Sequence, residues 1–374
     1  MYLKFRKNKL LRHPFRLQHM DKSKQILMLR KGRKYLMEKT GRIHYIDYLR
    51  GICMLWIVGV LHMADIIQLD IIQHPIAKHI TGGALAVFTL VSGYFMGHYP
   101  VNSKADILYF FRRRFLRIYP LFILACIWSW IICLRGGSFG LIFSVRQLLC
   151  TLLGVSWIIP PIPYTFWYMS VLIAFYAITP FINMIHSYKY KIFAMSLLFG
   201  FLCFLNYVNP NFDHRVLEYI PFYFIGLLLA PNNLMERVKY VSRKILVPVM
   251  LGSILLYIAA AYINFENLQY PSVFMFISSA AFTAGLCGIF IMLEPWIIRS
   301  VMLDGTLRFL GKISFSVYLI HRNIFSFYVD HIHIMTIPAV YLLLLPSIFL
   351  VSYLLQTLCD KLVSLIPYPQ KSIK

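Results

Sequence analysis

Residues 45–66 read YIDYLRGICMLWIVGVLHMADI. This apolar stretch has Asp47 and Arg50 near one end and His62 and Asp65 near the other. Its length suits a helix that crosses the hydrocarbon core of a bilayer, which takes about 20 mostly apolar residues. Ionisable side chains inside such a helix are costly in lipid, so each of them indicates a functional site. The stretch therefore predicts a membrane-spanning helix with polar chemistry at both ends.

Nine further apolar segments of similar length follow. The 374 residues are 59% hydrophobic and only 14% charged, whereas about a quarter of the residues of a soluble domain are charged. This composition excludes a soluble globule, because so much apolar surface needs contact with lipid. The predicted fold class is an all-α, polytopic membrane helix bundle of about ten transmembrane helices, at 45–66, 79–98, 117–134, 166–185, 192–208, 216–231, 245–264, 272–293, 313–329 and 338–358.

Charge sets the predicted topology. The chain has 37 Lys and Arg against 14 Asp and Glu, and cytoplasmic loops of membrane proteins carry the excess of basic residues. With ten spans and the N-terminus inside, the inside loops after residue 44 hold 17 basic residues and the outside loops hold four. Counting 141–159 as a span would reverse the later loops, so we expect this segment to be an interfacial or re-entrant helix. Both termini are then predicted to be cytoplasmic, and nucleic acid is not an expected partner.

Three regions follow from this topology. Residues 1–44 carry 14 basic and two acidic side chains and are predicted to form a cytoplasmic arm. Residues 45–358 form the membrane domain, and 359–374 are a short cytoplasmic tail. The seven cysteines lie almost entirely in apolar runs without the spacing of metal ligands, so we expect neither a metal site nor a disulfide framework.

The first span offers two groupings of ionisable residues. Asp47 and Arg50 are three residues apart, so they can pair on one helix face. His62 lies about 18 Å further along the helix, with Asp65 three residues beyond it. A histidine held by a carboxylate is suited to removing a proton from a hydroxyl group near neutral pH. The alternative is a snorkelling arginine and a histidine that only packs in the bundle.

The next predicted inside loop contains four arginines within six positions, namely Arg112, Arg113, Arg114 and Arg117. Guanidinium groups bind phosphates with two donors at once, whereas lysine offers a point charge. The cluster therefore predicts an anion site at the membrane surface. The alternative is topological, because basic residues belong in inside loops, but topology does not explain why all four are arginine.

Three other segments contain polar residues within or beside spans. Ser92 and Gly93 end the second span, where small residues favour close helix packing. Trp167 and Tyr168 open the fourth span, as in an interfacial aromatic belt. The ninth span contains Tyr318, His321 and Arg322, and the last two are costly in lipid. Together with His62 and the arginine cluster they indicate a polar cavity across the bilayer, although an ion or proton pathway would have a similar pattern.

In this order, the segments resemble the acyltransferase-3 family of integral membrane acyltransferases. The resemblance covers about residues 42–358. It rests on Asp47-Tyr-Leu-Arg50-Gly51 with His62, Phe88-Thr-Leu-Val-Ser92-Gly93-Tyr94, Arg113-Arg114-Phe-Leu-Arg117-Ile118-Tyr-Pro120, Phe166-Trp167-Tyr168-Met-Ser170 and Ile313-Ser314-Phe-Ser-Val-Tyr318-Leu319-Ile-His321.

The resemblance implies transfer of an acyl group, most simply acetyl, from cytoplasmic acyl-CoA to a hydroxyl of a cell-surface or lipid-linked carbohydrate. Arg113, Arg114 and Arg117 would hold the phosphates of acyl-CoA, and Arg50 would line the path of its pantetheine arm. His62 would be the base or acyl carrier, with His321 and Tyr318 as stabilising or orienting groups. Family members usually have ten residues between the first-span arginine and histidine, whereas this chain has eleven. A π-bulge near Gly59 would restore the direction of His62.

Val171-Leu172-Ile173 after Ser170, and a chain that ends soon after the tenth span, resemble the stand-alone branch associated with exopolysaccharide or capsule. That branch lacks a fused esterase-like domain. It implies the bacterial inner membrane and an association with polysaccharide biosynthesis machinery. Two alternatives remain at this point: a transporter or flippase for glycans or lipid-linked sugars, and a non-catalytic subunit of a polysaccharide assembly complex.

Overall fold

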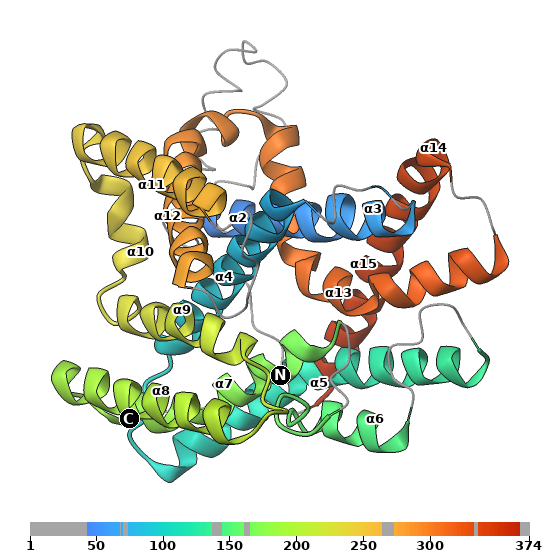
Figure 1. The fold of residues 1–374 in the computed structure, drawn as a ribbon, viewed down its shortest axis with the longest axis horizontal. Coiled ribbons are helices and arrows are strands. Elements are labelled where there is room, and N and C mark those ends of the chain that lie inside the picture. The colour runs from blue at the N-terminus through green and yellow to red at the C-terminus, as the bar shows by residue number, and fades with distance from the viewer. Residues whose placement is uncertain are drawn as a thin grey trace, which may run out of the picture. The chain divides into compact units, whose positions relative to one another are not determined.

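The computed structural model describes residues 43–67, 69, 74–136, 144–160, 165–263, 273–332 and 336–366 (Figure 1). The arm predicted at 1–44 falls outside these residues except for its last two, and residues 367–374 of the predicted tail at 359–374 also fall outside. Contacts divide the chain into residues 1–44 and a compact unit of residues 45–374, which is described below.

Every regular element in the described part of the chain is a helix, which confirms the all-α prediction. In chain order the elements are α2 (His44–Met54), the π-helix η3 (Leu55–His62), α3 (Met63–Ile66), α4 (Pro75–Gly97), α5 (Lys104–Leu134), α6 (Val145–Leu152), α7 (Trp167–Met184), α8 (Tyr188–Val208), α9 (Arg215–Leu229), α10 (Leu234–Arg237), the 3-10 turn η5 (Val238–Tyr240), α11 (Arg243–Ile263), α12 (Val273–Ile297), α13 (Val301–His331), α14 (Ile337–Ala339), the π-helix η6 (Val340–Leu344) and α15 (Leu345–Ser364).

Eight helical segments in the described residues are long and apolar enough to cross a membrane, so the chain has the character of a multi-pass membrane protein. They coincide with eight of the ten predicted spans. The other two predicted spans, 216–231 and 313–329, are also helical. Helix α9 has only 15 residues, and α13 contains several charged side chains, which keeps both out of this set. The total of ten spans, and the side of the membrane on which each terminus lies, stay predictions.

The segment predicted to be interfacial forms a short helix in its described part. Helix α6 has eight residues, which span only about 12 Å at 1.5 Å per residue. Turns follow it up to residue 160. A helix of this length cannot cross the hydrocarbon core, so the described part agrees with the exclusion of 141–159 from the spans.

Glycines allow the central helices to approach closely. Helix α4 packs along α9 and also contacts α12 (Figure 1). A Cβ atom on Gly93 would meet the carbonyl oxygen of Tyr223, and one on Gly226 would meet that of Leu90. In the same way, a Cβ atom on Gly311 of α13 would meet the Asp47 carbonyl oxygen. Backbone-to-backbone contact at these points brings α4 against α9 and α2 against α13.

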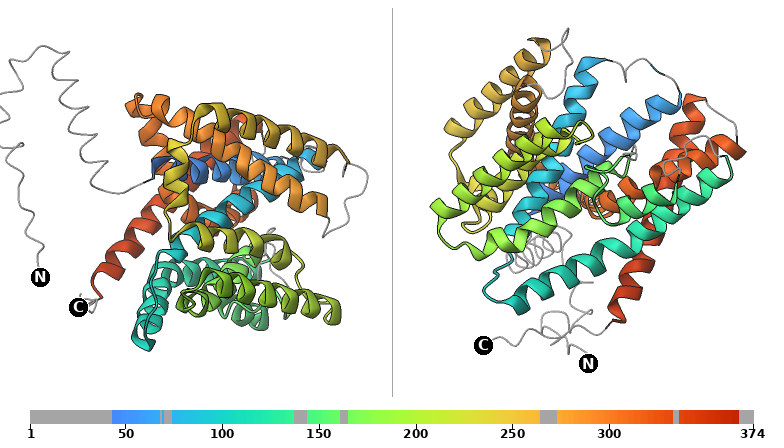
Figure 2. Two further views of the ribbon diagram at one scale, coloured as in Figure 1. Left: turned by 90° about the vertical axis from the view of Figure 1, so that its left-hand side faces the viewer. Right: turned by 60° about the horizontal axis from the view of Figure 1, so that its bottom comes forward.

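The outer helices present their side chains to the surroundings. In the most apolar window of α8 only 17% of the residues are buried, and in that of α11 only 11%. Such all-round apolar helices are stable when lipid covers the exposed side. Helices α8 and α9 lie side by side, as the views of Figure 2 also show.

Candidate active site

A π-helix ends at His62. Helix α2 continues directly into η3, which runs over Leu55–His62 with Gly59 buried at its middle. A π-helical turn accommodates one residue more than an α-helical turn, whereas an extra residue in a regular helix would rotate all later side chains by about 100°. The bulge predicted near Gly59 is therefore present, and it absorbs the additional residue between Arg50 and His62.

His62 faces His321 of α13. The Nδ1 atom of His62 lies 2.8 Å from the Nε2 atom of His321. The two imidazole rings are nearly parallel, with an interplanar angle of 6° and centroids 4.7 Å apart. His321 is fully buried, while His62 is partly exposed. The structure thus brings together the two histidines that the sequence placed in separate spans.

Backbone contacts determine which nitrogen atoms carry protons in this pair. The Nδ1 atom of His321 lies 2.8 Å from the carbonyl oxygen of Tyr318 and 3.1 Å from that of Val317. A carbonyl oxygen can only accept, so Nδ1 of His321 carries the proton and its Nε2 accepts in the neutral ring. His62 must then donate from Nδ1. The Nε2 atom of His62 is consequently left with a lone pair, as a general base requires.

Asp65 does not have the predicted position beside His62. Its Oδ2 atom lies 2.8 Å from Nη1 of Arg322, in an ion pair between α3 and α13. A guanidinium group binds a carboxylate with charge-assisted hydrogen bonds, which are stronger than those of a neutral imidazole. Arg322 follows His321 directly, so the same part of α13 holds both His62 and Asp65. The histidine of the first span is oriented by another histidine instead of a carboxylate.

Arg50 and Asp47 meet α13 about two to three turns before His321. An Nη2 hydrogen of Arg50 is donated to Oγ of Ser314 over 3.0 Å, and Ser314 is fully buried. Asp47 is buried as well, and its backbone carbonyl packs on Gly311. Sequence reasoning did not assign Ser314 a role. The sequence feature that could have identified Ser314 is the spacing of Gly311, Ser314, Tyr318 and His321, which places all four on one helix face.

Aromatic side chains line this site next to His321. The ring centroids of Tyr318 and His321 are 6.1 Å apart, and those of Tyr318 and Tyr168 are 5.7 Å apart. Tyr318 donates its hydroxyl hydrogen to the backbone carbonyl of Thr165. The Tyr168 hydroxyl lies 3.0 Å from the hydroxyl of Thr89 on α4. Tyr318 and Tyr168 thereby join α13, α7 and α4 around the histidine pair.

The interpretation of Trp167 and Tyr168 as an interfacial belt is wrong. Both side chains are buried, with exposed fractions of 8% and 4%. The guanidinium carbon of Arg215 lies 3.9 Å from the centroid of a Trp167 ring, and Arg215 forms two hydrogen bonds of 2.7 Å to Asp213. The aromatic pair turns inward because it has protein partners on two sides, which a sequence pattern does not reveal.

Ser92 and Gly93 lie where α4 meets α7 and α9. The Ser92 hydroxyl is 2.6 Å from the hydroxyl of Tyr176 on α7. Gly93 has the packing role that its size predicts, because its missing side chain admits the backbone of Tyr223. Ser92 adds a polar contact to that packing.

The arginine cluster lies on the first half of α5. Arg114 is buried and donates an Nη2 hydrogen to the Tyr99 hydroxyl over 2.6 Å. Its guanidinium carbon is also 4.9 Å from the Tyr99 ring centroid. The Nε atom of Arg114 is buried without a hydrogen-bond partner. Arg112, Arg113 and Arg117 are exposed. The cluster therefore combines a fixed guanidinium group, with one donor unused, and three exposed ones.

Separate polar contacts occur at intervals along α4 and just after its end, between the arginine cluster and the histidine site. Beginning at the arginine cluster, they involve Tyr99, then Ser92, and then Thr89. Thr89 lies about 12 Å of helix before the end of α4 at Gly97, and Tyr99 follows two residues later. Tyr168, the partner of Thr89, lies against Tyr318 and so reaches the histidine site. A series of hydroxyl groups thus extends from the arginines toward the histidines.

A model of a known protein family matches most of the chain. The family model described as "Acyltransferase domain", that of the acyltransferase-3 family, matches residues 43–357. The chain belongs to the acyltransferase-3 family. The match contains every helix described above from α2 to most of α15. No curated protein and no solved structure matches the chain significantly. The family assignment supports a membrane acyltransferase in general terms.

Proposed function

We propose that this protein is a membrane O-acyltransferase that moves an acyl group, most simply acetyl, from cytoplasmic acyl-CoA to a hydroxyl of a cell-surface or lipid-linked carbohydrate. The observation that carries the proposal is the pair of His62 and His321. Its hydrogen bonds leave a lone pair on Nε2 of a partly exposed histidine, which is the group that an acyl transfer to a hydroxyl needs.

His62 acts as the base in this proposal. Its Nε2 atom takes the proton of the acceptor hydroxyl as the hydroxyl oxygen forms a bond to the thioester carbonyl carbon. The carbon–sulfur bond then breaks, and the departing CoA sulfur receives the proton from His62. His321 orients His62 and does not donate to the oxyanion, because its only proton is directed to backbone carbonyls. Tyr318 likewise has its proton on Thr165 and is an orienting residue.

The arginine cluster fits the phosphates of acyl-CoA. Arg114 is held by Tyr99 and has an unused, buried Nε donor, and Arg113 and Arg117 are exposed beside it. Phosphate oxygens accept charge-assisted hydrogen bonds from such a set. The polar series along α4 and Arg50 would then line the path of the pantetheine arm toward His62. No metal ion has a part in this scheme.

The acceptor, the location and the partners are proposed on family resemblance. A stand-alone member of the exopolysaccharide or capsule branch would act in the bacterial inner membrane, beside polysaccharide biosynthesis machinery. Both termini and the arginine cluster would face the cytoplasm, where acyl-CoA is made.

The test is release of free CoA from acetyl-CoA and other acyl-CoA donors by the purified protein in lipid nanodiscs, with and without candidate glycans. His62→Ala is compared with wild type and with His331→Ala, an exposed histidine at the end of the same α13. We expect turnover in wild type and His331→Ala and none in His62→Ala. Glycan transport without CoA turnover would indicate a transporter, and unchanged chemistry in a His62→Ala protein would indicate that the pair has only a packing role.

A further inference from the structure

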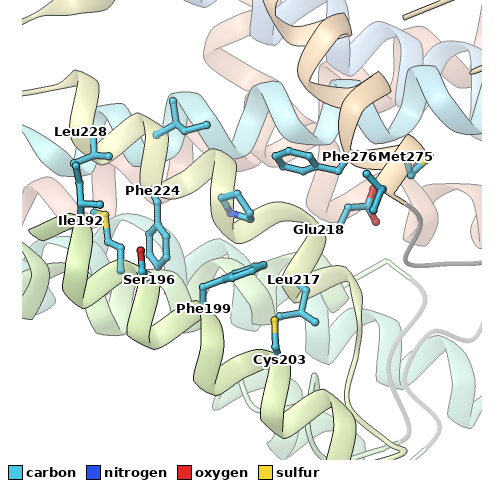
Figure 3. A pocket seen from close by; sticks show the side chains of 14 residues that line it. Ile192, Ser196, Phe199, Cys203, Leu217, Glu218, Phe224, Leu228, Met275 and Phe276 are labelled. Carbon is cyan, nitrogen blue, oxygen red and sulfur yellow. The ribbon is translucent and has the colours of Figure 1, made fainter. Parts of the chain in front are cut away.

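A lateral pocket lies apart from the histidine site. It has a volume of about 660 Å³ and is formed by α8, α9 and the start of α12 (Figure 3). Fourteen residues line it, and all except Ser196, Cys203 and Glu218 have purely apolar side chains or a thioether. Figure 3 shows Phe199 and Phe224 on its walls, with Glu218 beside Met275. The pocket is thus an apolar groove with one carboxylate.

The groove opens where the protein meets lipid. Helix α8 is an apolar helix with few buried residues, and Phe193 and Leu197 beside the groove are 60% and 59% exposed. Cys203, which lines the groove, is also exposed. Hydrocarbon chains surround such a helix in a bilayer, so the natural content of the groove is a hydrocarbon chain.

Glu218 gives the groove a buried carboxylate oxygen that lacks a hydrogen-bond partner. The residue is only 7% exposed, and its Oε1 atom is buried without a hydrogen-bond partner. The hydroxyl of Ser279 on α12 is unpartnered too. A Cβ atom built on Gly82 would lie 3.6 Å from Oε1 of Glu218 and 3.2 Å from Oγ of Ser279, so both atoms face the same side of α4. An unsatisfied buried carboxylate oxygen is costly, which indicates a ligand that donates to it.

Tyr219 shares a side-chain hydrogen bond with the carboxyl group of Glu218, but Oε1 itself has no partner, and the cation on α9 is already engaged. Arg215 lies one turn before Glu218 and directs its Nε and Nη2 atoms to Asp213. A carboxylate in an apolar surrounding is best satisfied by a cationic N–H donor. Phosphate or carboxylate head groups would add a like charge, and a quaternary ammonium group has no N–H to donate.

We propose that this groove is a lipid-binding site, in which one hydrocarbon chain of a primary-amine phospholipid lies between α8 and α9 while its ammonium group donates to Glu218. The site does not depend on the proposed acyl transfer. Helix α9 links it to the histidine site, because Tyr219, the neighbour of Glu218, has its ring centroid 5.9 Å from that of Trp167 and 6.3 Å from that of Tyr168. Helix α9 therefore has the lipid groove on one face and the aromatic residues of the active site on another.

Photocrosslinking tests where the hydrocarbon chain of the lipid lies. The full chain is placed in phosphatidylcholine nanodiscs with a trace of phosphatidylethanolamine carrying a diazirine in one acyl chain, and adducts are located by mass spectrometry. We expect adducts concentrated on the groove faces of α8 and α9. Ser196→Trp fills the groove and should reduce them several-fold, whereas Leu256→Trp on exposed α11 is the matched control and should not. Adducts spread evenly over the exposed helices, or unaffected by Ser196→Trp, would overturn the site.

Competition tests the head group. Unlabelled phosphatidylethanolamine should reduce the groove adducts more effectively than phosphatidylcholine or phosphatidylglycerol. Glu218→Gln keeps the shape of the side chain and removes its charge, so the preference for the amine lipid should fall about tenfold. Equal competition by all three lipids in wild type would contradict the role of Glu218. Oxidative crosslinking of Cys203 between two copies of the chain would also overturn the proposal, because the groove would then be a protein interface.

Discussion

The Nδ1 atom of His62 lies 2.8 Å from Nε2 of His321, although 259 positions separate them in the chain. His321 in turn is bonded through Nδ1 to the backbone of its own helix. This backbone contact selects the tautomer of both rings and presents the lone pair of His62. His321 has the role that a carboxylate has in a catalytic triad, because it orients the catalytic histidine and fixes its tautomer, but here the orienting group is a neutral imidazole.

Replacing His321 should lower the turnover number without changing donor binding. In His321→Leu the Nδ1 hydrogen of His62 loses its acceptor, so the base is no longer held in one tautomer and orientation. We expect kcat to fall about 100-fold, as for loss of general-base function, with KM for acyl-CoA unchanged. His321→Gln offers an oxygen acceptor and should recover part of the activity. Steady-state CoA release in nanodiscs measures both constants, and a Leu variant with wild-type kcat would refute the role of His321.

Two glycines of α13 should respond oppositely to alanine. A Cβ atom on Gly311 would collide with the carbonyl of Asp47, whereas Gly305 has open space around it. Gly311→Ala should therefore destabilise the fold by about 1–3 kcal/mol, the usual cost of overpacking. Gly305→Ala should be neutral or stabilise it by up to about 1 kcal/mol, because alanine is the better helix former. Thermal unfolding in a mild detergent compares them, and equal effects would contradict the close approach of α2 and α13.

Features that depend on one helix at a time could be predicted from the sequence. The apolar runs predicted the eight spans, and the residue count between Arg50 and His62 predicted the π-helix at Gly59. Both follow from local geometry, since span length and helical rotation are properties of consecutive residues.

Features that depend on partners from other helices could not be predicted. Asp65 was expected beside His62 from a spacing of three, but its partner Arg322 is 257 positions away. Trp167 was expected at an interface, and it is buried because Arg215 covers one face of its ring. Spacing indicates which residues share a helix face, but the stronger partner for that face comes from tertiary packing.

Replacing Arg114 should lower the affinity for acyl-CoA more than the rate of acyl transfer. Arg114 is the buried member of the arginine cluster and has an unused Nε donor. Arg114→Ala should raise KM for acyl-CoA about tenfold or more, the value of a charged hydrogen bond, with a smaller change in kcat. Arg135→Ala, at the opposite end of α5 and exposed, is the matched control. Dephosphorylated donors should be less sensitive to Arg114→Ala, and an unchanged KM would place the phosphates elsewhere.

The π-helix should tolerate a deletion and reject an insertion. Removing Val60, which is only partly buried, lets η3 revert to an α-helix while His62 keeps its direction toward His321. Adding an alanine at the same place requires a second bulge or turns His62 by about 100°. We expect the deletion variant to retain acyl transfer and the insertion variant to lose it, with both proteins still inserted in membranes. CoA release from matched amounts of folded protein measures the difference. Loss of activity in the deletion variant alone would mean that the π-helix does more than set the direction of His62.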